Sequence, residues 1–294
     1  MARKAVVTAG TGGIGLETAL GLAKAGYAVT VVGRDASRGA QAVERINAGG
    51  GEPARFLRAD LSSLDQVKAL GERIANEGDL AVLVNNVGAM FADRTDLDGV
   101  EATFVVNHLS PALLTELLLP ALTAGAPSRV VNVTTAAVAL AKKVFDHAEP
   151  PGGYYGFHWY GRAKLANLAH TLDLAQRLQG TGVTVLAADP GGAATDMTNG
   201  TTRKPKIVSP GLRLLWPLVR RRFERSTSGP ASAAARSSIV AATDPTLTTG
   251  LLINAQGTPV TPIKAATDPH VVTAVRRLTE QHLPQTRVPD GVSN

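Results

Sequence analysis

A tyrosine and a lysine four residues apart are the side chains in this sequence best suited to acid–base chemistry. Tyr160 and Lys164 lie in the run Tyr-Gly-Arg-Ala-Lys, and this spacing places them on one face of a helix. A free phenol titrates near about pH 10, but a neighbouring ammonium stabilises the phenolate and lowers its pKa. Tyr160 is therefore a candidate to donate a proton to a carbonyl oxygen or to remove one from an alcohol.

A glycine-rich turn near the start of the chain is a candidate phosphate-binding site. Residues 8–15 read Thr-Ala-Gly-Thr-Gly-Gly-Ile-Gly directly after an apolar run. A helix that starts there offers free N–H groups and a positive dipole end to a pyrophosphate, and glycines allow close approach. A flexible surface turn is the alternative. The expected contacts are Gly10, Thr11, Gly13, Ile14 and Gly15.

An arginine after the second predicted strand favours a cofactor with an additional phosphate. In dinucleotide-binding folds, an acidic residue at that strand end binds the ribose 2′-hydroxyl, whereas an arginine accommodates a 2′-phosphate. Here Gly33 ends the strand and Arg34 follows, and a guanidinium matches phosphate geometry. We therefore expect NADP(H) in preference to NAD(H), with a solvated surface arginine as the alternative.

The elements that must position these residues alternate along the chain. Apolar strands are expected at 5–9, 28–32, 55–59, 80–85, 129–134, 184–188 and 250–254, and helices at 14–25, 37–48, 63–77, 99–122, 160–178, 229–243 and 270–282. Apolar strands separated by helices indicate a parallel sheet covered on both faces. Right-handed crossovers then give a doubly wound, Rossmann-type α/β fold. We expect one domain over residues 1–294, with 89–98, 136–158 and 193–228 outside the alternation.

Composition narrows the classes of protein that this chain can belong to. The 294 residues are 44% hydrophobic and include no cysteine, which excludes disulfides and thiolate chemistry. The six histidines show no metal-ligand spacing, so no metal is expected. No uninterrupted run reaches the roughly 18 apolar residues of a membrane helix, and the first strand leaves no room for a signal peptide. We therefore expect a cytoplasmic protein.

The basic charge of the chain is concentrated in one segment. Residues 203–225 carry eight basic residues and one acidic residue, whereas the whole chain has a net charge of +6. Because aromatic residues are scarce among these arginines and lysines, we do not expect a nucleic-acid partner.

Five ordered motifs make the chain similar to the short-chain dehydrogenase/reductase family over almost its whole length. The glycine turn resembles the family's, with Ala9 in place of its first glycine. The other motifs that match are Asp60-Leu61, Asn85-Asn86-Val87-Gly88, Asn107 within Val-Asn-His-Leu, and Asp189-Pro190-Gly191 with Thr195. The resemblance implies contacts to the adenine from Asp60 and Leu61, and to the nicotinamide carboxamide from Pro190, Gly191 and Thr195. It also implies that Asn86, Val87 and Gly88 bind the cofactor.

The same resemblance implies a catalytic tetrad. Tyr160 is the acid or base, Lys164 lowers its pKa and binds the nicotinamide ribose, and Asn107 fixes a backbone kink and a water in a proton relay. Thr135 stands where the family has serine. Its hydroxyl can donate to the substrate oxygen, although its methyl group stiffens χ1. The alternative is that Thr135 is simply a β-branched strand residue.

Within that family, the chain resembles the retinol-dehydrogenase-like branch. The runs Val106-Asn107-His108-Leu109 and Lys164-Leu165-Ala166-Asn167 and the long insertion at 136–158 are typical of it. Branch similarity does not fix the substrate. The family's substrate lid falls at 193–228, where apolar residues alternate with arginines. This pattern fits a lid over a bulky apolar substrate, a membrane-surface contact, or a solvated helix packed on the core.

Two functions remain open from the sequence. The first is an NADPH-dependent oxidoreductase that reduces a ketone or aldehyde of an apolar small molecule, reversibly. The second is a protein of the same fold without net redox turnover, such as a cofactor-binding regulator or an isomerase or cyclase. Thr135 and Ala9 keep the second open, whereas intact Tyr160, Lys164 and Asn107 argue against it. The family's subunits pair through the helices expected at 99–122 and 160–178, so we expect a homo-oligomer.

Overall fold

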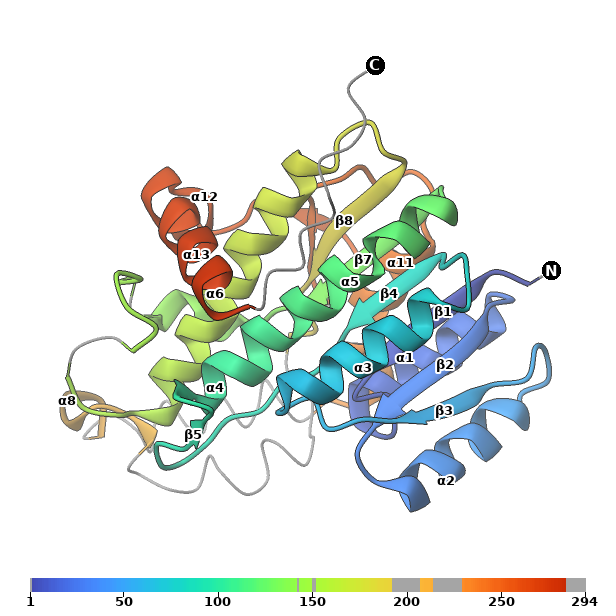
Figure 1. The fold of residues 1–294 in the computed structure, drawn as a ribbon, viewed down its shortest axis with the longest axis horizontal. Helices are drawn as coiled ribbons and strands as arrows, with labels where there is room; N and C mark the ends of the chain where they lie inside the picture. The colour runs from blue at the N-terminus through green and yellow to red at the C-terminus, as the bar shows by residue number, and fades with distance from the viewer. Residues whose placement is uncertain (1, 142, 150–151, 192–206, 214–228, 284–294) are drawn as a thin grey trace.

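Strands of β-branched residues form the centre of the molecule, and helices cover both of its faces (Figure 1). The computed structural model describes residues 2–141, 143–149, 152–191, 207–213 and 229–283. Within these ranges, eight strands form one sheet in the order β10-β9-β8-β7-β4-β1-β2-β3. They are β1 (Lys4–Thr8), β2 (Ala28–Gly33), β3 (Arg55–Arg58), β4 (Val82–Asn85), β7 (Ser128–Val133), β8 (Val183–Ala188), β9 (Leu252–Ile253) and β10 (Pro259–Val260).

The sheet has the doubly wound topology that the sequence predicts. Neighbouring strands are parallel from β3 through to β9. The strand order reverses between β1 and β4, which is where ligands bind in sheets of this type. The expectation of a fully parallel sheet needs one correction, because β10 pairs antiparallel with β9 at the edge. Thr258 closes this short hairpin through its N–H, which donates to Asn254 Oδ1 at 3.0 Å.

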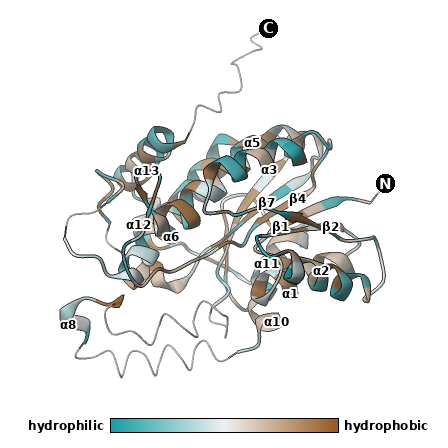
Figure 2. Ribbon diagram, turned by 60° about the horizontal axis from the view of Figure 1, so that its bottom comes forward, coloured by the Kyte–Doolittle hydropathy of each residue, from teal (hydrophilic) through white to brown (hydrophobic). Residues whose placement is uncertain are grey.

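Two layers of helices cover the sheet. The first layer contains α1 (Gly13–Lys24), α2 (Ala36–Asn47), α10 (Ala231–Ala234) and α11 (Arg236–Thr243). The second contains α3 (Leu64–Ala75), α5 (Ser110–Ala124), α6 (Gly156–Arg177), α12 (Lys264–Thr267) and α13 (Pro269–His282). Apolar residues face the sheet, and Figure 2 shows hydrophilic colouring on the outward sides of α2 and α13. Burial of these apolar faces supplies most of the driving force for folding.

One predicted helix is interrupted by an irregular turn. The sequence predicts a continuous helix over 99–122, but the structure has α4 (Ala102–Phe104), a π-helical turn (Val105–Leu109) and then α5. The continuous segment Ala102–Ala124 is long and apolar enough to cross a membrane by composition alone. Because 78% of its most apolar window is buried inside the protein, it is a core helix here.

Short elements occupy the stretches that fall outside the predicted alternation. The strands β5 (Asp96–Leu97) and β6 (Val100–Glu101) form a hairpin that leads into α4. A 3₁₀ helix (Ala136–Leu140) begins the insertion at 136–158. The following helix, α6, begins at Gly156, four residues before the predicted start. It therefore includes His158 and Trp159 in its first turn.

The C-terminal helices pack along α6 and bury most of it. The Asp173 carboxylate on α6 forms an ion pair with Arg276 on α13. The ring of His108 in the π-helical turn hydrogen-bonds Thr279 on α13, with 2.7 Å between Nε2 and Oγ1. Since α12 and α13 already cover this side of α6, any subunit contact through α6 must form around them.

Candidate active site

The candidate residues come together because they follow strands that all point the same way. The glycine turn follows β1, Arg34 follows β2, Asp60 follows β3, and the Asn86–Gly88 segment follows β4. Residues 134–135 follow β7, and residues 189–191 follow β8. The carboxyl ends of parallel strands share one edge of the sheet, so this edge gathers both halves of the predicted site. Thr195 lies outside the described residues.

The glycine turn folds tightly against the start of α1. Ala9 and Gly13 adopt positive φ angles of 49° and 52°, a region in which glycine is unstrained. A Cβ on Gly15 would lie 2.3 Å from the Ala9 carbonyl oxygen, so only glycine fits there. Ile14 lies in the first turn of α1, which begins at Gly13 after the N-cap residue Gly12. The turn therefore presents the first N–H groups of α1, as a phosphate-binding site requires.

The segment after β4 is bonded to the end of β1. Thr8 Oγ1 accepts hydrogen bonds from the N–H groups of Asn86 at 2.9 Å and Val87 at 3.2 Å. The Asn86 side-chain amide donates back to the Thr8 carbonyl at 3.1 Å. These bonds fix the two segments at the point where the strand order reverses. The Val87 side chain itself is buried in the core.

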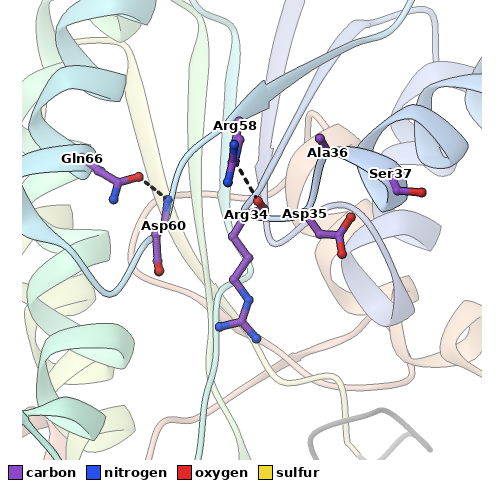
Figure 3. A pocket seen from close by; sticks show the side chains of 7 residues that line it. All are labelled: Arg34, Asp35, Ala36, Ser37, Arg58, Asp60 and Gln66. Atoms are coloured by element: carbon purple, nitrogen blue, oxygen red, sulfur yellow. Dashed lines mark hydrogen bonds between the residues drawn. The ribbon is translucent and has the colours of Figure 1, made fainter.

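A pocket of about 790 Å³ lies at the ends of β2 and β3 (Figure 3). Its lining residues are Arg34, Asp35, Ala36, Ser37, Arg58, Asp60 and Gln66. The Arg58 Nε donates to the Arg34 carbonyl at 3.0 Å, while the Arg34 guanidinium extends away from it (Figure 3). Burial alone would raise the pKa of Asp60. Hydrogen bonds from Ser62 and the positive charge of Arg34 together outweigh this effect and hold the pKa below its usual value.

Two arginines in this region were not identified from the sequence. Arg58 shares the pocket with Arg34, and the guanidinium of Arg38 lies 2.8 Å from where a Cβ on Gly12 would be. The sequence signal that could have found them is their proximity to predicted site residues. Arg58 lies two residues before Asp60, and Arg38 lies four residues after Arg34. The Leu61 side chain is buried in the core, so its side chain does not contribute to this pocket.

Lys164 joins α6 to the ends of two strands. It is 3% exposed, and its Nζ donates to the carbonyl oxygens of Val87 at 3.0 Å and Val133 at 2.9 Å. Burial lowers the pKa of Lys164 to about 7. Gly88 is packed between this lysine and Asn107, because a Cβ on it would lie 3.6 Å from Lys164 Nζ and 3.5 Å from Asn107 Oδ1.

Asn107 lies in the π-helical turn and is fully buried. Its Nδ2 donates to the carbonyl oxygens of Ala89 at 2.7 Å and Thr103 at 2.8 Å. Its Oδ1 accepts from the Ala89 N–H at 3.2 Å. The side chain therefore ties the π-helical turn to the segment that follows Gly88.

The Tyr160 phenol and the Thr135 hydroxyl lie close enough to interact. Burial raises the pKa of Tyr160, the nearby Thr135 hydroxyl opposes this rise, and the charge of Asp189 adds to it. The sequence-based expectation was a lowered pKa through Lys164. The direction differs because burial dominates and the lysine's hydrogen bonds run to backbone carbonyls. Thr135 Oγ1 also accepts from the Ala137 N–H at 3.3 Å and so caps the 3₁₀ helix.

The segment after β8 completes the row of strand ends. Asp189 Oδ1 accepts from the Gly191 N–H at 2.9 Å, and Gly191 has a φ of 69°. Pro190 is buried between them. The following segment, predicted to be a lid over 193–228, is described only at 207–213. There Ile207 and Val208 are buried in one cluster with Tyr160, Phe157 and Ala137. An apolar wall therefore lies beside the candidate acid.

Comparisons with known proteins identify the family. The family model of short chain dehydrogenases matches residues 3–206. The chain belongs to the short-chain dehydrogenase/reductase family. Retinol dehydrogenase 12 of Mus musculus is 38% identical over 227 residues, which are 76% of this chain and 69% of that protein. Retinol dehydrogenase 12 of Homo sapiens is 37% identical, and the match covers 72% of this chain and 66% of that protein. The expected retinol-dehydrogenase-like branch is thus confirmed.

Solved structures of this family share the fold. The RhlG/NADP active-site complex of Pseudomonas aeruginosa has a TM-score of 0.67 and 27% sequence identity, covering 87% of this chain and 95% of that one. A protein of Mycobacterium paratuberculosis has a TM-score of 0.68 and 26% identity, covering 95% of this chain and 92% of that one. As a short-chain dehydrogenase/reductase, the chain is an oxidoreductase whose fold binds a nicotinamide cofactor. Among the described residues, no group of three histidine or acidic side chains is arranged to hold a metal ion.

Proposed function

We propose that this short-chain dehydrogenase/reductase is an NADPH-dependent enzyme that reduces a ketone or aldehyde of an apolar small molecule, reversibly. The observation that carries the proposal is the placement of the Tyr160 phenol within interaction range of the Thr135 hydroxyl, beside the strand end to which Lys164 is bonded. A phenol next to a hydroxyl gives a carbonyl oxygen two donors, which is what a developing alkoxide needs. A bound nicotinamide supplies the hydride.

The residues of the chain divide the remaining work. Tyr160 gives its proton to the substrate oxygen in reduction and removes it in oxidation, and Thr135 orients that oxygen. Lys164 uses two of its three donors on backbone carbonyls, and we assign the third to the nicotinamide ribose. Asn107 holds the π-helical turn against Ala89. Pro190 and Gly191, with Thr195, complete the nicotinamide side.

The preference for NADPH rests on the charge around one pocket. Arg34 and Arg58 line it, and Arg38 lies over the glycine turn beside it. Guanidinium groups bind phosphate by paired, charge-assisted hydrogen bonds. The 2′-phosphate of NADPH is thus assigned to Arg34, with Arg58 as a second contact. Asp60 contributes to the adenine side, while its carboxylate stays bonded to Ser62.

Replacing Arg34 tests the cofactor preference. We expect Arg34→Ala to weaken NADPH binding by about tenfold or more while leaving NADH binding unchanged, because a charged hydrogen bond to phosphate contributes roughly 1.5–3 kcal/mol. Arg73→Ala on α3 serves as the matched control. Fluorescence titration of both cofactors reads out the Kd values. Equal loss of NADPH and NADH binding would overturn the assignment.

An apolar substrate fits the wall beside Tyr160. Phe157, Ile207 and Val208 are buried there, with Met90 and Ala92 packed against them. Contacts of this kind favour apolar ligands, with the polar groups of Tyr160 and Thr135 fixing their orientation. The packing of Ile207 and Val208 beside Tyr160 supports the interpretation of 193–228 as a substrate lid. The rest of that segment, including its other arginines, lies outside the described residues.

NADPH consumption with a panel of apolar ketones, aldehydes and quinones tests the activity. Consumption that disappears in Tyr160→Phe is the expected result. NADPH binding without consumption would favour the alternative of a family member without net redox turnover. The structural observation that favours this alternative concerns Ala9. Its φ of 49° would be unstrained for the glycine that the family has at this position.

Two further properties are proposed from the sequence. We propose a cytoplasmic location and a homo-oligomer of unspecified size. Cell fractionation tests the first and light scattering of the purified protein tests the second. Because α12 and α13 cover one side of α6, subunit contacts through the outer surfaces of α5 and α6 would have to include these C-terminal helices.

A further inference from the structure

Glu101 is a buried carboxylate at the start of the helix that leads to Asn107. Glu101 is only 1% exposed to solvent. Its Oε1 accepts from the Thr103 N–H at 2.8 Å and from Thr103 Oγ1 at 2.6 Å. Its Oε2 accepts from the Phe104 N–H at 3.1 Å. The carboxylate therefore caps α4 with both of its oxygen atoms, which also suits the positive end of the helix.

The capped turn in turn binds Asn107. The Thr103 carbonyl oxygen accepts from Asn107 Nδ2 at 2.8 Å, and the same Asn107 side chain makes two bonds to the backbone of Ala89. Three groups thus form a chain of hydrogen bonds from Glu101 through Thr103 to Asn107. A shift of the capped turn moves Asn107 relative to the segment that carries Gly88.

The same carboxylate also contacts the segment that leads into α6. The Tyr154 hydroxyl lies 3.3 Å from Glu101 Oε1, 3.3 Å from Thr103 Oγ1 and 3.0 Å from the Phe91 carbonyl oxygen. The Tyr154 ring packs against Trp159, with 5.0 Å between ring centroids, and Trp159 precedes Tyr160. Glu101 therefore lies where the segment after β4, the π-helical turn and α6 meet.

A buried cation on α6 interacts electrostatically with this carboxylate. The Arg162 guanidinium is buried and donates to the carbonyl oxygens of Val144, His147 and Ala148 at 2.9, 2.6 and 2.7 Å. Its positive charge and the negative charge of Glu101 attract each other across the buried region. Removing a buried charge of this kind leaves its partner uncompensated, which is costly.

We propose that Glu101 is a positioning residue for the catalytic tetrad, holding Asn107 and the Tyr160 helix in register through Thr103 and Tyr154. This inference rests on the proposed function only for its effect on turnover. The placement itself is a property of the folded chain and is testable without substrate.

Amide hydrogen exchange measures the placement directly. The Ala89 N–H donates to Asn107 Oδ1, so its exchange rate reports the position of Asn107. We expect Glu101→Gln to raise the exchange rate of the Ala89 amide by about tenfold, because the amide group presents hydrogens to donors that need an acceptor. Glu116→Gln is the matched control, since Glu116 also joins α5 to α6 through Arg177. Faster exchange confined to residues 102–105 would overturn the proposal.

Turnover separates positioning from a structural cap. With the substrate found for the wild type, we expect Glu101→Gln to lower kcat by roughly tenfold or more while the Kd of NADPH stays unchanged, because small misplacements of catalytic groups reduce rates strongly. Tyr154→Phe leaves the cap on α4 intact, so a lowered kcat there would show that the link to α6 is needed. Unchanged kcat in both variants would overturn the proposal. If the wild type consumes no NADPH, the proposed function fails, and the exchange result alone decides this inference.

Discussion

Lys164 Nζ lies 3.0 Å from the carbonyl oxygen of Val87. The lysine of α6 is thereby bonded to the segment after β4, and its second bond reaches the end of β7 at Val133. One side chain connects the elements that carry Gly88, Thr135 and Tyr160. Its burial has a consequence for the pH dependence of stability, since burial lowers its pKa to about 7.

Stability should rise with pH through the contribution of Lys164. Its pKa is about 7 in the folded protein and about 10.4 in an unfolded chain. Between these values the unfolded chain binds more protons, so the free energy of unfolding increases with pH. Urea unfolding of the wild type and Lys164→Met checks this. We expect the difference in stability, wild type minus variant, to grow from about pH 7 to about pH 9, and a constant difference would contradict it.

The two directions of the reaction should respond differently to pH. Burial raises the pKa of Tyr160, so the phenol is protonated at neutral pH and ready to act as an acid. Reduction should therefore gain nothing from a rise in pH, whereas alcohol oxidation, which needs the phenolate, should rise with pH. Initial rates in both directions give the two profiles. An oxidation rate that falls with pH would rule out Tyr160 as the base.

Thr135 should act through its hydroxyl. We expect Thr135→Ser to retain kcat within about threefold and Thr135→Val to lose roughly 100-fold, the typical effect of removing one donor to a developing oxyanion. Thermal unfolding of both variants is the control, because Thr135 also caps the 3₁₀ helix. Near-normal turnover by Thr135→Val would show that Thr135 is simply a strand-end residue.

Ala9 should be a source of strain that glycine relieves. Its φ of 49° costs an L-residue roughly 1–2 kcal/mol. Glycine avoids this strain, but its greater freedom in the unfolded chain offsets about half of the gain. Ala9→Gly should therefore stabilise the protein by about 0.5–1 kcal/mol in urea unfolding. Gly13→Ala, at a φ of 52°, should be destabilising and is the matched reverse change. A destabilised Ala9→Gly would contradict the argument.

Two buried histidines should make the protein sensitive to acid. His108 and His170 lie edge to face, with 5.7 Å between ring centroids, and burial lowers the pKa of both. Because the unfolded histidines bind protons below about pH 6.5, the free energy of unfolding falls as the pH drops through that value. The double variant His108→Gln and His170→Gln should lose less stability on acidification. His270→Gln, at an exposed position, should behave as the wild type.

Much of the fold could be predicted because burial imposes a clear pattern. Strands such as β2 and β8 are mostly apolar and buried, and their observed bounds lie within two residues of the predicted ones. The strand order follows from right-handed crossovers. By contrast, the π-helical turn around Asn107 has no compositional signal, and the two-residue strands β5, β6 and β10 are too short to show a period.

The candidate site was predictable where motifs follow strands, and not where distant side chains meet. Thr135, Tyr160 and Asp189 come together because β7, α6 and β8 are neighbours in the sheet and on its face. Tertiary burial set the raised pKa of Tyr160, which residue spacing alone does not report. The hydrogen bonds among Glu101, Thr103, Tyr154 and the Phe91 carbonyl depend on how the insertion packs, which the sequence pattern does not show.

The packing of α13 on α6 also has a consequence for synthesis. Val271, Val275 and Leu278 of α13 share an apolar cluster with Leu165 and Leu168 of α6. Chains emerge from the ribosome from the N-terminus, so α6 is synthesised before α13. Until α13 is made, the apolar surface of α6 that it covers remains exposed. In a nascent chain released before α13 emerges, this apolar surface of α6 stays exposed to solvent near Lys164 and Tyr160. We expect such a fragment to be bound by chaperones or degraded, because transiently exposed apolar surface makes incomplete chains prone to aggregation.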